Sequence, residues 1–109
     1  MSQDLEVGQA WVKHELFPRL TQEYRDSLPI TEHYGWKTPV EPLRSTFYFA
    51  VKDLADVQLI DVPLRLLEEA AHPHNADERR QIEVLLRQKI ESARMTVQRA
   101  AEENTHGRR

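Results

Sequence analysis

Six prolines constrain the fold of this 109-residue chain more than any other feature. Proline has no backbone N–H to donate and its ring crowds the preceding helical turn, so helices and strands tend to end or bend beside it. All six lie within the first 73 residues, at Pro18, Pro29, Pro39, Pro42, Pro63 and Pro73. They therefore divide this part of the chain into short segments and leave the longest hydrophobic pattern for the residues that follow.

The stretch after Pro73 has the pattern of a long amphipathic helix. Asn75 can cap its start, and Asp77 and Glu78 place negative charge near the positive end of the helix dipole. From Leu86 onward the apolar positions alternate at intervals of four and three, as in a coiled coil. We therefore expect a homodimer in which the two copies of this helix meet through Leu86, Ile90, Ala93 and Val97.

The first segment, Ser2 to Leu28, also has helical spacing, through Leu5, Val12, Leu16, Leu20 and Tyr24. Ser2 or Asp4 can cap this helix. Pro18 cannot donate a hydrogen bond to residue 14, so the helix is expected to bend there or to restart with Pro18 in its first turn.

The middle of the chain is harder to assign. Residues 29–42 contain three prolines and Tyr34-Gly35-Trp36, which predicts a loop. Residues 45–51 have the β-branched and aromatic content of a strand, but Leu43, Phe47, Ala50, Leu54 and Val57 recur at helical intervals. The longer pattern favours a helix, with a strand as the open alternative. Asp61 before Val62-Pro63 then predicts another short helix, ending before Pro73.

These patterns together predict an all-α fold. We expect a bundle of about four helices, with the first bent at Pro18 and a long one at the C-terminus. A length of 109 residues suits one core, so residues 1–103 are expected to form a single domain. Residues 104–109 lack periodicity and are expected to form a flexible tail.

Composition excludes several classes of function. Fifteen basic residues against eighteen acidic ones give a net charge of -3, which disfavours a phosphate-binding or membrane-surface protein. The absence of cysteine excludes disulfides, cysteine-ligated metals and thiol catalysis. With neither an apolar N-terminal leader nor a long apolar run, the chain is expected to be cytoplasmic.

The candidate chemical motifs are weak. His14-Glu15 begins like a zinc-binding helix, but the position four residues after His14 is Pro18. His72, His74 and Asp77 lie close in sequence, yet a helix start repels a cation and the same residues suit a turn with caps. No nucleophile and base stand in a recognisable motif. We therefore expect no metal site, no cofactor and no enzymatic activity.

What remains is more apolar helical surface than one chain needs. We expect a small interaction protein that regulates another protein by occupying its surface, as an anti-activator, antagonist or adaptor, with a transcriptional regulator as one possible target. Its binding site is predicted at the aromatic and apolar residues Tyr34, Trp36, Phe47 and Leu54. The alternative is a DNA- or RNA-binding regulator that uses arginines of the C-terminal helix, although acidic residues lie among them.

Overall fold

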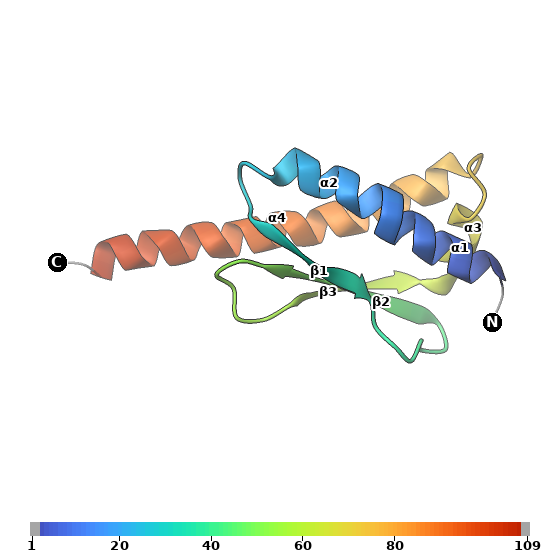
Figure 1. The fold of residues 1–109 in the computed structure, drawn as a ribbon, viewed down its shortest axis with the longest axis horizontal. Coiled ribbons are helices and arrows are strands. Elements are labelled where there is room, and N and C mark those ends of the chain that lie inside the picture. The colour runs from blue at the N-terminus through green and yellow to red at the C-terminus, as the bar shows by residue number, and fades with distance from the viewer. Residues whose placement is uncertain (1–2, 108–109) are drawn as a thin grey trace.

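A computed structural model describes residues 3–107, and it contains a sheet that the all-α prediction lacked. An N-terminal helical run of α1 (Gln3–Trp11), η1 (Val12–Leu16) and α2 (Phe17–Tyr24) precedes three strands, β1 (Ile30–Trp36), β2 (Arg44–Val51) and β3 (Gln58–Pro63). The helices α3 (Leu64–Ala70) and α4 (Ala76–Gly107) follow. The strands form one antiparallel sheet in the order β1-β2-β3, and the helices lie on one side of it (Figure 1). The fold is α+β, so the prediction of a helical bundle is wrong.

The predicted helix over residues 43–57 is instead strand β2 and the turn after it. Alternation decides the matter: Ser45, Phe47, Phe49 and Val51 are buried, and the residues between them are half-buried. A helical stripe would have buried Phe47 but not all of these aromatic and β-branched side chains on one face. At the two ends of the expected stripe, Leu43 and Val57 are exposed. The strand alternative over residues 45–51 is therefore the correct one.

Two further expectations in this region are wrong. The Tyr34-Gly35-Trp36 segment is part of β1, which pairs with β2 so that Trp36 lies opposite Phe47. Asp61 is a residue of β3, opposite Thr46, and does not cap a helix. Helix α3 begins only at Leu64, and the extended Pro63 (φ −57°, ψ 135°) occupies its N-cap position.

The N-terminal run stays helical across Pro18, which the structure places in the first turn of α2. The five preceding residues form the π-helical segment η1, in which the N–H of Phe17 bonds to the carbonyl of Val12. A π turn holds one residue more than an α turn, so it offers room next to a proline that cannot donate. The irregularity is thus a widened turn before Pro18. Ser2, one of the two expected caps, lies outside the described residues.

Helix α4 begins where the sequence predicted, just after Asn75. It continues to Gly107, past Glu103, where we expected a flexible tail to begin; Arg108 and Arg109 lie outside the described residues. At 1.5 Å per residue its 32 residues span about 48 Å. Its C-terminal part extends beyond the sheet and the other helices (Figure 1).

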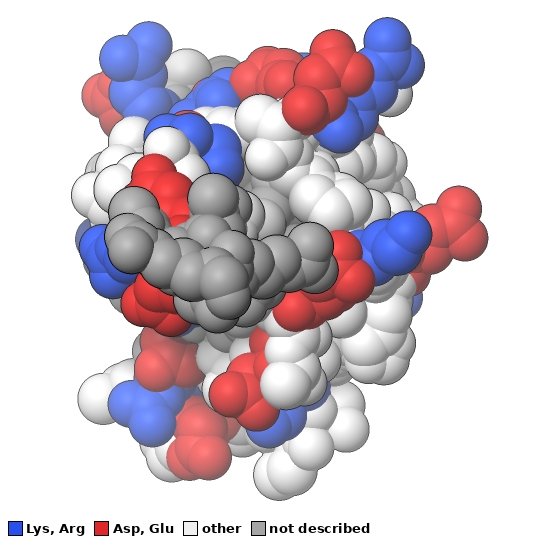
Figure 2. All heavy atoms as spheres, turned by 90° about the vertical axis from the view of Figure 1, so that its left-hand side faces the viewer, with Lys and Arg blue, Asp and Glu red and all other residues white. Residues whose placement is uncertain are grey.

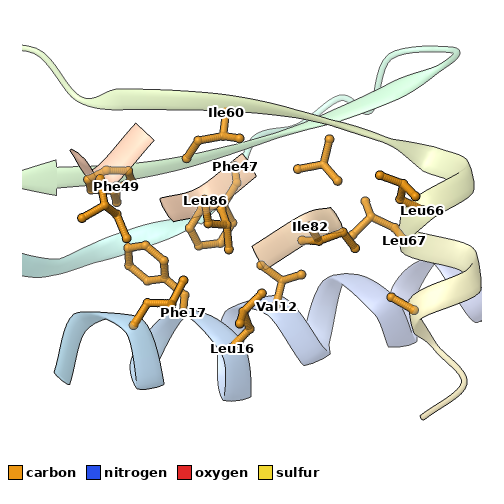
Figure 3. Packing of buried hydrophobic residues seen from close by; sticks show 14 of the residues in the cluster. Val12, Leu16, Phe17, Phe47, Phe49, Ile60, Leu66, Leu67, Ile82 and Leu86 are labelled. Atoms are coloured by element: carbon orange, nitrogen blue, oxygen red, sulfur yellow. The ribbon is translucent and has the colours of Figure 1, made fainter. Parts of the chain in front are cut away.

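The core lies between the sheet and the helices (Figure 3). Phe17 is its aromatic centre, with ring centroids 4.8 Å from Tyr34, 4.9 Å from Phe47 and 5.3 Å from Phe49. Tilted rings at these separations have favourable edge-to-face contacts in addition to their buried area. The aromatic residues of the strands therefore hold the N-terminal run on the sheet.

Candidate functional site

The structure turns the expected partner-binding residues inward. Phe47 is fully buried, and Tyr34, Trp36 and Leu54 are partly buried and pack against the core. The indole N–H of Trp36 donates to the backbone carbonyl of Gln9 at 2.8 Å, and its ring meets Phe47 edge-on. These side chains connect the sheet to the helices and do not form an exposed cluster.

The residues expected at a dimer interface also lie within the single chain. Leu86, Ile90 and Ala93 are buried in the core, and Val97 is partly buried against it. A second copy could reach Leu86, Ile90 and Ala93 only if the elements that bury them moved away. The homodimer stays a prediction, and on α4 it would have to use outward residues such as Val84 and Met95.

His72, one of the candidate metal ligands, has an ordinary structural partner. Nε2 of His72 lies 3.2 Å from Oδ2 of Asp4, which ties the turn before α4 to α1. The side chain of Asn75 donates to the carbonyl and the carboxylate of Glu69, so it closes the same turn. No group of three or more potential metal ligands occurs among residues 3–103, whose side chains the structure describes. Within the same residues, no helix has both the length and the apolar character required to cross a membrane.

The most prominent surface feature is a pair of grooves, one on each side of α4. Arg80 and Val84 form the ridge between them and line both grooves. Both residues are exposed, and Val84, at 45%, is among the few large hydrophobic side chains left open to solvent. The first half of α4 thus has a different groove on each side of this ridge.

The groove between α4, α3 and the end of β3, here called the apolar groove, has a volume of about 550 Å³. Its walls are mainly the apolar groups of Val84, Leu85, Leu66 and Pro63. Four polar residues also line it: Asp61, Arg80, Gln81 and Gln88. A mainly apolar lining with a few polar groups is the usual composition of a protein-binding patch.

The groove between α4 and the N-terminal run, here called the basic groove, has a volume of about 560 Å³. Four arginines, one glutamate and one tryptophan line it, with three smaller residues; the charged and aromatic ones are Arg19, Arg79, Arg80, Arg87, Glu83 and Trp11. The guanidinium carbon of Arg79 lies 4.4 Å from the centre of the Trp11 ring, and its Nε donates to the carbonyl of Ala70 at 2.9 Å. A cation over an indole face is attracted by the ring, so Arg79 is held in one orientation.

Glu83 organises the other side of the basic groove. Its carboxylate accepts from Arg19 at 3.2 Å and from Arg87 at 2.9 Å, and Arg87 also contacts Glu23 at 2.8 Å. Partial burial by itself raises the pKa of Glu83, but the hydrogen bonds from Arg87 and Arg19 outweigh it and the pKa is lowered. The hydrogen bond to Glu83 in turn raises the pKa of Arg87. Glu83 and Arg87 are therefore both charged at neutral pH.

Arg80 is the exception in this network. Its side chain makes no hydrogen bond or ion pair with any of residues 3–103, although it lies on the ridge between both grooves. Farther along α4, Arg94 is paired with Glu91 at 2.9 Å. The face seen in Figure 2 has basic and acidic side chains intermixed. Within the basic groove, Arg80 is thus the arginine whose side chain has no partner in the described part of the chain.

Sequence reasoning missed this surface for two reasons. Trp11 and Arg19 lie far from Arg79 and Arg80 in sequence, and only the packing of the N-terminal run against α4 brings them together. The apolar groove depends on β3, which the sequence analysis assigned to a helix start. One signal was available in the sequence. Val84 is an apolar residue outside the buried stripe of α4, so it adds hydrophobic surface that the core does not use.

Searches with protein-family models, with curated proteins and with solved structures each gave no match to this chain.

Proposed function

We propose that this chain is a non-catalytic domain that binds another protein through the two-groove surface of α4. The observation that carries the proposal is the apolar groove beside exposed Val84. A cavity of about 550 Å³ is large enough for several side chains of a partner. Binding there would bury apolar area that the chain itself leaves in water.

Charge complementarity indicates the kind of partner. Arg80 lines the apolar groove, and its side chain has no acidic partner among the described residues. A segment with apolar side chains for the groove and a carboxylate for Arg80 would satisfy both features. By binding such a segment, this small domain would regulate its partner, as an antagonist or adaptor does.

Peptide selection tests this proposal without knowledge of the natural partner. A random peptide library is selected on the immobilised protein, and the enriched peptides are measured against two variants, Val84→Asp and Val7→Asp. Val7 on α1 is a matched control, because the two valines are 43% and 45% exposed and both lie on helices. Circular dichroism checks that each variant is folded.

We expect the enriched peptides to bind the wild type and Val7→Asp equally and to bind Val84→Asp at least about tenfold more weakly. An acid beside the apolar groove would have to lose its water when an apolar side chain docks. Peptides that bind Val84→Asp as tightly as the wild type would overturn the proposal, as would a selection that enriches none.

A further inference from the structure

We infer that the basic groove binds the carboxylates of an acidic segment, that is, aspartate or glutamate side chains of a partner protein. The inference rests on the proposed function, because Arg80 and Val84 border both grooves and one partner segment could reach both. It adds a chemical class of ligand and a second set of binding residues around Trp11.

Arg79 has the arrangement of a preorganised anion-binding residue. Its guanidinium stacks on Trp11 and uses Nε for the Ala70 carbonyl. No hydrogen bond of its two terminal nitrogens falls within residues 3–107. A planar guanidinium fixed in this way can accept a carboxylate in the two-pronged geometry that arginine favours. Little side-chain entropy remains to be lost on binding, since the stacking has already restricted the arginine.

Arg80 and Arg19 add positive charge on either side of Arg79. Arg80 has no partner in the described part of the chain, and Arg19 contacts Glu83 through one terminal nitrogen while its side chain stays 53% exposed. Arg87, by contrast, is occupied by Glu83 and Glu23. One glutamate among four arginines leaves the groove positive, and Arg19, Arg79 and Arg80 are the residues available to an anion.

The surroundings favour a short acidic peptide over a nucleic acid. A phosphate backbone is bound by a long row of unpaired cations, and its repeated charges are repelled by nearby acids. Here Asp77 and Glu78 stand in the first turn of α4, Arg94 is paired with Glu91, and the whole chain carries a net charge of -3. A short segment with a few carboxylates needs only the cations of this groove, whereas a phosphate backbone needs a longer row of unpaired cations.

The two tryptophans provide a built-in probe. In an NMR titration with an octaglutamate peptide, the indole N–H signal of Trp11 should shift, because its ring lies under Arg79. The signal of Trp36 should stay in place, because that indole is bonded to Gln9 inside the fold. Binding should weaken as salt is added, since exposed charges are screened.

Two charge reversals on the same helix complete the test. Arg80→Glu removes a groove cation, whereas Arg99→Glu makes the same change at an exposed position of α4 outside both grooves. We expect Arg80→Glu to weaken octaglutamate binding about tenfold or more and Arg99→Glu to change it by less than about twofold. Equal loss in both variants would show only a general charge effect and would overturn the inference.

Other probes separate the remaining ligands. The inference is also overturned if inorganic phosphate alone shifts the Trp11 signal at concentrations as low as the peptide needs, or if a short DNA duplex binds more tightly than octaglutamate and depends on Arg80. If octaglutamate fails while selected peptides still depend on Val84, the acidic-ligand inference falls and the proposed function stands. If octaglutamate binds but peptide selection fails, the carboxylate site stands and the proposed function falls.

Discussion

The N-terminal helical run and α4 lie on the same side of the sheet, but they pack in different ways (Figure 1). Helix α4 is regular, and its buried residues recur every three or four positions: Ile82, Leu86, Ile90 and Ala93. The N-terminal run contains a π segment, a proline and a buried glycine, Gly8, which faces the backbone of α3.

This difference shows which contacts a sequence reveals. The regular helix is positioned by side chains on one stripe, so spacing alone predicts its buried face. In the N-terminal run, Leu16 and the next residue, Phe17, are both fully buried, and the π hydrogen bond places Phe17 one turn after Val12. The position of the N-terminal run also depends on backbone contacts, which the spacing of apolar residues does not reveal.

The largest expected effect concerns the regular helix. Ile90 is fully buried, so Ile90→Glu places a carboxylate in the core without a partner. We expect the free energy of unfolding to fall by at least about 4 kcal/mol, measured by chemical denaturation. Met95→Glu is the control, because Met95 is 42% exposed on the same helix and should change stability by no more than about 0.5 kcal/mol.

The protein concentration separates the core from a dimer interface. If Ile90 acts within one chain, Ile90→Glu lowers the free energy of unfolding by the same amount at every protein concentration. Two results together would contradict this: the unfolding midpoint of the wild type rises with protein concentration, and Ile90→Glu remains a folded monomer. Ile90 would then belong to the dimer interface that the sequence predicted.

A smaller effect is expected at the close contact of the N-terminal run. A Cβ at Gly8 would overlap the carbonyl oxygen of Leu67, which is backbone and cannot rotate away. We expect Gly8→Ala to destabilise the protein by about 2 kcal/mol, even though alanine favours helix by about 1 kcal/mol. Thermal or chemical unfolding measures the change.

Gly35→Ala is the matched control for that substitution. Its Cβ would lie 3.3 Å from Oη of Tyr48, the movable end of a side chain, so we expect a change below about 1 kcal/mol. If Gly8→Ala proved as mild as Gly35→Ala, or stabilising, the close approach of α1 and α3 would not be a feature of the folded protein.

The same contrast explains what could be predicted from sequence. Helix α4 and its apolar stripe were predicted from spacing, but the stripe was assigned to a second copy, whereas Leu86, Ile90 and Ala93 are buried within the chain. The sheet was not predicted, because Phe47 fits a helical stripe and a strand equally, and only pairing with β1 and β3 decides between them. At the site, the arginines of α4 were visible, but their arrangement around Trp11 depends on the long-range packing of two helices.

A still smaller effect is expected where the two helical regions are joined by charge. Glu83 on α4 accepts from Arg19 of α2 and from Arg87, so Glu83→Gln should cost about 1 to 2 kcal/mol at neutral pH. The folded pKa of Glu83 is lowered from 4.5, so its stabilisation is present above that pH and is lost as pH falls through the folded pKa. The difference in the free energy of unfolding between wild type and Glu83→Gln should therefore shrink on acidification below about pH 4.5. A difference that stays constant down to pH 3 would contradict this role.

The smallest effect is expected at Pro18, in the irregular part of the N-terminal run. In Pro18→Ala the new N–H could donate to a helix carbonyl, which stabilises, while the unfolded chain gains freedom, which destabilises. These effects oppose each other, so we expect a net change of no more than about 1 kcal/mol in either direction. The π segment should persist, because its removal would turn buried Leu5 and Val12 away from the core. Amide exchange at Phe17 tests this, since its N–H bonds to the Val12 carbonyl in the π turn. Loss of folding in Pro18→Ala would instead show that proline itself, and not the packing of the run, holds the widened turn in place.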